Sequence, residues 1–494
     1  MFNIFKPTLL HRGRTGMWLL LAGFAITATG CGTENDLASS SSTVSKPADI
    51  VQASADNYDD NVNGLITGNT LDSWLTDWEA NRPAGITGKL VILQTSAGGA
   101  GFEYIKPDGT NVFTFSVDSS EWVETRSNGV TETVSMVPSG RAMDTFLAKY
   151  GIDPAEDMIV CAQGAAGAGQ SMRAGRCWYM FRYWGTPKEH LAVLNGGNDW
   201  NGTGTNSTLE GNDFTDTASV PPMNGTASVK DLPEINMALQ ATLEDMHNIV
   251  PAQDINLLGD GIFIWDARGN TFPASDPGSS SDEYSPDDDS DFRNSGATQG
   301  HPNGALLLSY SNLLNSAEGY TFKTKAEIQT YLDGDVDGGG TGFVGADLQP
   351  VGLGAGYQEG DVVYTYCETT FRAMVTGIAS GVIMGLPTRF YDGAMTEWHS
   401  MANEVASDGN PVLPWDSQWR TDKSTVSMFL TNTDPANVAP RNIVDAYASS
   451  ANAVIIEDLA YKGYVVETTT TADSSDGTGS SGGGGALPPN PCGG

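Results

Sequence analysis

Cys367 is the residue whose place in the sequence points most directly to chemistry. It follows an apolar run at residues 361–366 that predicts a strand, and residues 371–384 predict a helix after it. The loop at residues 368–370 would bring backbone N–H groups towards the sulfur beside a helix N-terminus, which stabilises a nucleophilic thiolate. A thiolate there could accept a sulfane sulfur atom as a persulfide and pass it on, dividing one transfer into two steps. A buried structural thiol is the alternative interpretation.

Strands and helices that would position this loop alternate in two stretches of the chain. Short apolar runs read as strands, and longer amphipathic or apolar runs between them read as helices. The alternation predicts an α/β fold with two parallel sheets, each flanked by helices. The predicted strands are residues 89–94, 158–162, 191–194, 261–266, 361–366 and 388–391, and the predicted helices are residues 143–150, 177–184, 324–332 and 371–384.

A set of motifs in a fixed order resembles the rhodanese (sulfurtransferase) family. The second stretch carries DAR at residues 266–268, GHPNGA at 300–305, TYCETTFR at 365–372 and FYDGAMTEW at 390–398. In the first stretch, AGRCWYMFRYWG at residues 174–185 and LNGGNDW at 194–200 are similar to the family's degenerate N-terminal domain. The resemblance covers roughly residues 84–400 and implies two rhodanese-like domains, each a parallel sheet flanked by helices. Departures are an acidic insertion at residues 276–295 and a Gly-rich insertion at 334–360.

The resemblance implies roles for residues around the predicted nucleophile. Cys367 would carry the persulfide, and Arg372, which closes the Cys-x4-Arg spacing, would hold the loop and add positive charge. Arg268 matches a family position near the loop, with Asp266 as its partner; a substrate contact and a structural ion pair are both open for these two. The active loop would consist of Glu368, Thr369, Thr370 and Phe371.

The sulfur donor is left open by this loop. Thiosulfate-specific relatives carry basic residues after the cysteine, whereas Glu368 stands here. The basic residue expected shortly after Arg268 is also missing. We therefore expect weak use of thiosulfate and better use of less charged sulfane-sulfur donors, with a thiol or a cyanide-like nucleophile as acceptor. No cofactor is expected to be required.

The first domain is expected to lack a nucleophile. Aligning its strand at residues 158–162 with the one before Cys367 places Gln163 at the equivalent position. Cys161 falls inside that strand and Cys177 inside an apolar helix, so both are interpreted as core thiols. A disulfide between them is the alternative. The first domain would then be a non-catalytic partner.

The N-terminus resembles a lipoprotein signal peptide. Basic residues precede an apolar run at residues 17–26, small residues occupy 27–30, and Cys31 follows, a pattern typical of secretory signals. A cysteine directly after small residues is similar to a bacterial lipobox, which implies that Cys31 is lipidated; a plain signal peptide is the alternative. The expected location is the bacterial cell envelope, anchored by lipid, with the outer membrane as default because Gly32 follows the cysteine.

The boundaries predicted from these patterns divide the chain into seven parts. They are a signal peptide at residues 1–30, a tether and N-terminal extension at 31–83, a non-catalytic rhodanese-like domain at 84–205, an interdomain linker with a helix at 206–259, a catalytic rhodanese-like domain at 260–400, a C-terminal extension at 401–466 and a disordered tail at 467–494. The tail contains Cys492, which is either a resolving thiol or incidental.

The net charge of the chain limits the classes of molecule that it can bind. The 494 residues include 25 Lys and Arg against 60 Asp and Glu, a net charge of −35. This excludes a nucleic-acid-binding surface, because phosphate contacts need clustered Lys and Arg.

One acidic segment has the spacing of a calcium loop. Asp333, Asp335 and Asp337 precede a glycine in a D-x-D-x-D-G pattern, but Val344 stands where an EF-hand loop has its bidentate Glu. The segment is therefore either a structural calcium site or a solvated acidic loop.

Two function classes follow from the whole sequence. The first is an extracytoplasmic, lipid-anchored sulfurtransferase that works through a persulfide on Cys367. The second is a non-enzymatic rhodanese-like protein that binds sulfur or selenium, or assists an envelope redox protein. The intact Cys-x4-Arg loop favours the first class, and the departures at Glu368 and Phe272 favour the second.

Overall fold

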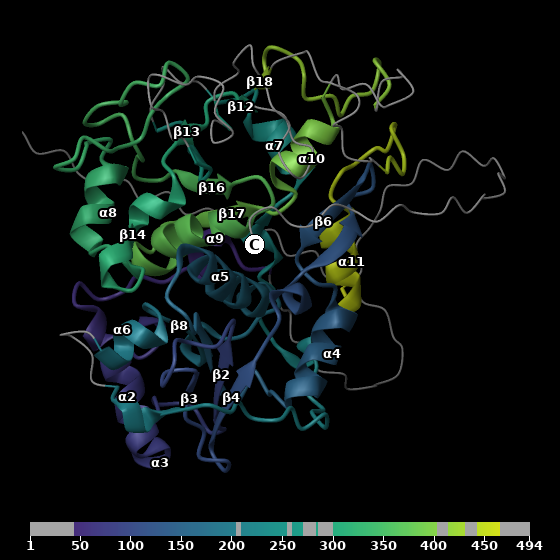
Figure 1. Ribbon diagram of the computed structural model, residues 1–494. Helices are drawn as coiled ribbons and strands as arrows, with labels where there is room; N and C mark the ends of the chain where they lie inside the picture. Colours follow the sequence, from purple (N-terminus) through teal and green to yellow (C-terminus); the bar gives the residue numbers. More distant parts are fainter. Residues whose placement is uncertain are drawn as a thin grey trace, which may run out of the picture. The chain divides into compact units, whose positions relative to one another are not determined.

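A computed structural model describes residues 44–203, 209–253, 259–269, 283–284, 300–402, 413–429 and 442–464, and these form two parallel sheets with helices packed on them (Figure 1). No helix in this described part is long and apolar enough to cross a membrane. The predicted lipidation site and the predicted tail lie outside the described residues.

The first sheet has five parallel strands in the order β1-β8-β7-β2-β4. Its central strands are runs of consecutive apolar residues because both faces are covered. Along β2, Val91 and Leu93 face the core shared with the second sheet, while Leu90 and Ile92 face a core formed with Trp74 and its neighbours in α2 and α3. The strands are β1 (Gly64–Ile66), β2 (Leu90–Gln94), β4 (Val112–Ser116), β7 (Met158–Ala162) and β8 (Leu191–Leu194), and the covering helices α2 and α3 are Gly68–Thr76 and Trp78–Asn81.

The second sheet repeats this arrangement with the order β10-β17-β16-β11-β13. Counted within each sheet, both read 1-5-4-2-3, so the two halves share one topology. The strands are β10 (Gln240–Ala241), β11 (Ile262–Asp266), β13 (Leu306–Leu307), β16 (Val362–Tyr366) and β17 (Thr388–Tyr391). The predicted α/β class with two parallel sheets flanked by helices is therefore confirmed.

Helices and short antiparallel pairs complete the described part. The other helices are α1 (Pro47–Ile50), α4 (Gly140–Tyr150), α5 (Ala168–Tyr183), α6 (Asn198–Thr203), α7 (Leu243–Ile249), α8 (Lys325–Leu332), α9 (Phe371–Ile378, followed by a π-turn at Ala379–Ile383), α10 (Ala394–Ser400) and α11 (Ala453–Tyr461). The paired short strands are β3 (Tyr104–Ile105) with β9 (Phe214–Thr215), β5 (Glu124–Ser127) with β6 (Glu132–Met136), β12 (Gly300–Pro302) with β18 (Ser427–Phe429), and β14 (Leu314–Asn315) with β15 (Thr321–Phe322).

Helices α5 and α9 join the two halves. α5 packs on β7 and β8, α9 packs on β16 and β17, and the two helices pack against each other (Figure 1). Gly175 makes this close approach possible, because a Cβ there would lie 2.8 Å from the Cβ of Met374. The shared core therefore runs from one sheet through both helices to the other.

The first strand of each sheet lies outside the domain boundaries that were predicted from the sequence. β1 lies in the segment assigned to an N-terminal extension, and β10 lies in the segment assigned to a linker. These strands have three and two residues, which is too short for a pattern of alternation to show in the sequence. The segment predicted as a C-terminal extension also contributes, since Asp458 of α11 pairs with Arg126 of β5 at 2.7 Å.

Cys161 and Cys177 form a disulfide between β7 and α5. The preferred interpretation of two core thiols is therefore wrong, although both residues are fully buried. A helix that returns onto its own preceding strand brings the two positions together, which the spacing of cysteines alone does not reveal.

Removing this disulfide is expected to lower stability. The bridge closes a loop of 16 residues, and a loop of that length is associated with about 3 kcal/mol of stabilisation. We expect the double variant Cys161→Ala/Cys177→Ala to lose about this amount of free energy of unfolding in urea. Wild-type protein under reducing conditions should lose a similar amount, and equal stability of all three samples would contradict the expectation.

Candidate active site

The Cys367 loop lies where β16 ends and α9 begins. Thr370, the residue before the helix, has a left-handed backbone conformation with φ of +68°. This conformation is unfavourable for a β-branched residue, with a cost of about 1–3 kcal/mol, and such strain concentrates at functional sites. The loop is held by neighbouring groups: Thr370 Oγ1 donates to the carbonyl of Asp392 at 2.7 Å, and the Met395 N–H donates to the carbonyl of Cys367 at 3.0 Å.

Cys367 itself is fully buried. Its side chain clusters with Ala267 and Ala373, and Tyr310 packs against this cluster. Ala267 follows β11, Cys367 follows β16 and Ala373 lies on the first turn of α9, so these three small residues meet where the elements end or begin. A solute can reach the sulfur only if some of the surrounding structure moves.

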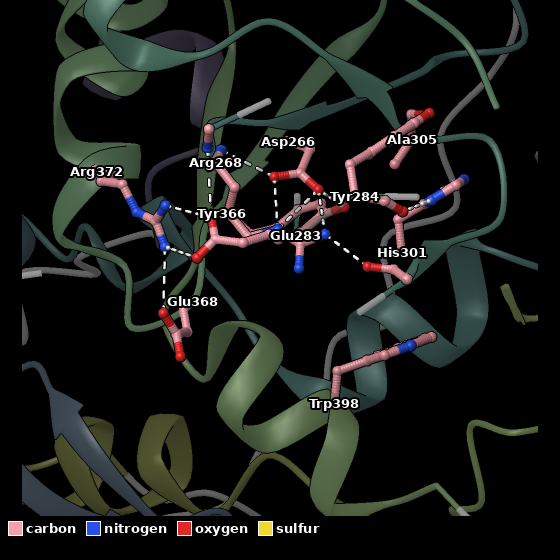
Figure 2. Close-up of polar contacts among 12 residues, drawn as sticks. Asp266, Arg268, Glu283, Tyr284, His301, Ala305, Tyr366, Glu368, Arg372 and Trp398 are labelled. Atoms are coloured by element: carbon pink, nitrogen blue, oxygen red, sulfur yellow. Dashed lines mark hydrogen bonds and ion pairs between the residues drawn. The ribbon is translucent and has the colours of Figure 1, made fainter. Parts of the chain in front are cut away.

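Arg372 lies between two carboxylates, as Figure 2 shows. Its guanidinium forms a bidentate pair with Glu283, in which Nη1 contacts Oε2 and Nη2 lies 3.1 Å from Oε1. Nη2 also lies 3.3 Å from Oε2 of Glu368, four residues earlier on the same turn. The sequence placed Arg372 and Glu368 at the loop, and the structure brings them into direct contact.

Glu283 is the site residue that the sequence analysis missed. Glu283 lies in the acidic insertion at residues 276–295, yet it is only 7% exposed and the following Tyr284 is fully buried. The Tyr284 ring stacks on His301 with centroids 3.8 Å apart, and its hydroxyl donates to the carbonyl of Ala305 at 2.7 Å. Glu283 lies 89 positions before Arg372 in the sequence. The acidic composition around Glu283 gives no indication of this contact.

Asp266 and Arg268 form a buried ion pair beside the loop. Arg268 Nη2 lies 2.5 Å from Asp266 Oδ2, and the same guanidinium donates to the carbonyl of Gly300 at 2.6 Å (Figure 2). Tyr366, the last residue of β16, donates its hydroxyl to Asp266 at 2.8 Å. Burial raises the pKa of Tyr366 well above its usual value, and the Asp266 carboxylate raises it further, so the phenol stays protonated as a donor. Of the two interpretations left open for this pair, the geometry supports the structural one.

A second buried ion pair connects the first domain to the loop. Arg176 of α5 lies 2.5 Å from Asp392, and both side chains are fully buried. The Arg176 guanidinium also lies over the ring of Phe371, the first residue of α9, at 5.8 Å. Since the Asp392 carbonyl accepts from Thr370, the first domain supports the loop through this pair.

The equivalent position in the first domain holds Gln163. It follows β7 as Cys367 follows β16, and β7 and β16 have the same place in their sheets. Its backbone carbonyl accepts from Thr95 Oγ1 at 2.6 Å. An amide side chain is not a nucleophile, so the loop of the first domain has no counterpart to the Cys367 thiol.

The three aspartates of the predicted calcium loop have separate partners. Asp333 accepts from Gln329, Asp335 from the N–H of Val336, and Asp337 from Tyr331 and from two backbone N–H groups of its own turn. The hydrogen bonds of this turn lower the pKa of Asp337, and the Tyr331 hydroxyl contributes to the shift. Within the part of the chain that the structure describes, no three acidic, His or Cys side chains gather as a metal site. Calcium binding by this loop stays a prediction.

Glu397 of α10 is a buried carboxylate between the two halves. It accepts hydrogen bonds from Asn128 Nδ2 at 2.7 Å and Thr133 Oγ1 at 3.2 Å, and burial raises its pKa to about 7. A small cavity lies beside it, lined by Gln240 and Asn452 among others, and none of its lining residues belongs to the Cys367 loop.

Stability is expected to fall with rising pH through the titration of Glu397. The folded protein binds this proton up to about pH 7 and the unfolded chain only up to about 4.5, so the contribution is full below pH 4.5 and is lost as pH rises through 7. The shift corresponds to about 3 kcal/mol. Glu397→Gln keeps an acceptor for Asn128 but cannot titrate, so the variant should gain stability relative to wild type between pH 5 and pH 8 in urea unfolding. Parallel pH profiles of the two proteins would contradict this.

Comparisons with known proteins concern the fold. No protein-family model matches the chain, and no curated protein matches its sequence. Similar solved structures include the Tum1 protein of Saccharomyces cerevisiae, with 16% identity, a TM-score of 0.45 and coverage of 68% of this chain and 95% of that one. The 3-mercaptopyruvate sulfotransferase SseA of Escherichia coli, described as having the rhodanese fold, has 16% identity, a TM-score of 0.40 and coverage of 67% and 98%. An anaerobic ergothioneine biosynthesis enzyme of Chlorobium limicola has 14% identity, a TM-score of 0.43 and coverage of 68% of each chain. At these identities the similarity is one of fold.

Proposed function

We propose that this protein is a sulfurtransferase that carries sulfane sulfur as a persulfide on Cys367. The observation that carries the proposal is the position of this thiol, at the end of the central strand β16 in a strained turn that leads into α9, with Arg372 on the first turn of that helix. Helix N-termini and adjacent cations favour the thiolate. The motif order in the sequence supports the same assignment.

The transfer consists of two displacements at sulfur. The Cys367 thiolate attacks the outer sulfur of a donor such as an alkyl persulfide, R–S–SH; the S–S bond of the donor breaks, and the products are the enzyme persulfide anion and the thiol R–SH. A nucleophilic acceptor such as cyanide then takes the outer sulfur, which gives thiocyanate and regenerates the thiolate. Neither step needs an external oxidant or reductant.

Detection of the persulfide by intact mass tests this function. Treatment of the protein with polysulfide should add the mass of one sulfur atom, and cyanide should remove it. Peptide mapping should place the added sulfur on Cys367. A protein that acquires no cyanide-labile sulfur under these conditions would contradict the proposal.

A non-enzymatic role is the second candidate. Two observations favour it: Cys367 is fully buried, and Arg372 is neutralised by two carboxylates. In this role the protein would bind sulfur or selenium, or assist an envelope redox protein. Formation of a persulfide without transfer to any acceptor would identify this case.

We further propose that the protein is anchored to the cell envelope through a lipid on Cys31. The support is the signal-like N-terminus, in which small residues precede the cysteine. Wild-type protein expressed in a bacterium should partition into the detergent phase, and Cys31→Ala should shift it to the aqueous phase, because a thioether-linked lipid anchor requires the thiol. Aqueous partitioning of the wild type would contradict the anchor.

A further inference from the structure

The contact between Arg372 and Glu283 resembles the recognition of an anionic ligand. A guanidinium that forms two parallel hydrogen bonds to one carboxylate has the geometry with which arginine binds carboxylates and other oxyanions. The Arg372 side chain is 12% exposed and that of Glu283 is 10% exposed, so the pair is largely withdrawn from water. Glu283 thus occupies the face of Arg372 that an anionic sulfur donor would use.

Glu283 is held in this position by the structure around it. The backbone carbonyl of Glu283 accepts from the N–H of Gly300 at 3.2 Å, and its carboxylate accepts from the N–H of Gly269 at 3.4 Å. The adjacent Tyr284 is fixed by its stacking on His301 and by a hydrogen bond from its hydroxyl to the carbonyl of Ala305. Tyr284 also accepts at its carbonyl from His301 Nδ1 at 2.8 Å, with the imidazole as donor. The carboxylate is therefore positioned by its hydrogen bond from Gly269 and by the buried contacts of the adjacent Tyr284.

Among the described residues that form these ion pairs beside the loop, the carboxylates outnumber the guanidinium groups. Arg268 and Asp266 cancel each other, whereas Arg372 faces both Glu283 and Glu368. These five side chains leave a net charge of −1 beside Cys367. A dianionic donor would meet repulsion there, and an uncharged donor would not.

We propose that Glu283 is a specificity-determining residue of the Cys367 site, where its carboxylate occupies Arg372 and selects uncharged sulfane-sulfur donors over dianionic ones. This inference rests on the proposed sulfur transfer. Thiosulfate would have to displace the Glu283 carboxylate from Arg372 or bind beside it. An alkyl persulfide in its neutral form would not have to displace Glu283 or bind beside it, because its outer sulfur is uncharged and does not require a guanidinium partner.

Both donors undergo the same displacement, which makes them a fair comparison. Thiosulfate would transfer its outer sulfur to the Cys367 thiolate and leave as sulfite, and an alkyl persulfide would transfer its outer sulfur and leave as a thiol. The enzyme persulfide is the same in both reactions. A difference between the donors then reports on how each is bound.

The test measures thiosulfate binding without turnover. In the Cys367→Ser protein, isothermal titration calorimetry should show that Glu283→Gln binds thiosulfate roughly 10- to 100-fold more tightly, since one carboxylate at about 5 Å is removed from the anion. Glu283→Asp keeps the charge and should resemble the parent. Glu359→Gln removes an exposed carboxylate of the Gly-rich insertion and serves as the matched control, with no expected change. Adding Arg372→Gln to Glu283→Gln should abolish the gain.

Kinetics with the native Cys367 complete the test. Glu283→Gln should lower the KM for thiosulfate, and the ratio of kcat/KM for thiosulfate to kcat/KM for an alkyl persulfide should rise. Unchanged thiosulfate affinity in Glu283→Gln, with Cys367 still acquiring sulfur, would overturn the donor selection and leave the transfer standing. Absence of sulfur on Cys367 with both donors in both proteins would overturn the transfer, and the donor selection with it.

Discussion

Replacing Cys367 by serine is expected to abolish sulfur transfer. A hydroxyl group is not ionised near neutral pH and cannot form a persulfide, so no covalent intermediate is available. Removal of a nucleophile of this kind lowers turnover on the order of a thousandfold or more. Thiocyanate formation from cyanide, measured with an alkyl persulfide as donor, should fall to the rate without protein.

The remaining cysteines provide the controls for this result. Cys161→Ser and Cys177→Ser break the disulfide, and each should lower the free energy of unfolding while transfer persists in the folded fraction. Full turnover in Cys367→Ser would refute the assignment and direct attention to Cys492, which lies outside the described residues. Circular dichroism of Cys367→Ser should match wild type, since Ser is close to Cys in size.

Arg176→Met is expected to destabilise the protein by about 3–5 kcal/mol. The substitution leaves the Asp392 carboxylate fully buried without its cationic partner, and an uncompensated buried charge is costly. It also removes the contact of the guanidinium with Phe371 at the start of α9. Urea unfolding at pH 7 measures the loss, and sulfur transfer should fall as well because the Asp392 carbonyl holds Thr370 of the loop.

A second substitution separates charge from packing. Adding Asp392→Asn to Arg176→Met removes the buried charge, so the double variant should be more stable than Arg176→Met alone. Arg82→Met provides the control, because Arg82 is 30% exposed and pairs with Glu79 on the surface, and its change should stay within about 0.5 kcal/mol. A loss below about 1 kcal/mol in Arg176→Met would contradict the role assigned to the buried pair.

The central strands and their following helices were predictable because their patterns are local. Residues 158–162, 191–194 and 388–391 were predicted as strands and form β7, β8 and β17 with the same bounds. A strand covered on both faces is a short run of apolar residues, and such a run is visible in a window of a few positions. Three of the four edge strands, β1, β10 and β13, have two or three residues and depend on pairing with a neighbour, so they leave no local pattern in the sequence. The fourth, β4, has five residues and was also not predicted.

The candidate nucleophile could be chosen from the sequence because its setting is also local. Cys367, the three loop residues and Arg372 lie within residues 367–372, which run from the end of a strand into the first turn of a helix, and this order of elements alone places the thiol at the strand end. The two interpretations of Asp266 and Arg268 could not be separated in the same way. Deciding between substrate contact and ion pair required the burial of both side chains, which depends on what packs over them.

The sequence by itself therefore determined the α/β class, the duplication, the strand–loop–helix setting of Cys367 and the absence of a thiol at Gln163. Only the tertiary structure decided the disulfide between Cys161 and Cys177, the support of the loop by Arg176 and the contact of Glu283 with Arg372. The physical reason is the range over which each feature is encoded. Periodicity and turn signals act between residues a few positions apart, whereas Arg176 and Asp392 lie 216 positions apart and Glu283 and Arg372 lie 89 apart. Such pairs meet only when the two sheets and the helices between them have packed. Each buried charge then needs its partner, because an unpaired buried charge is strongly destabilising.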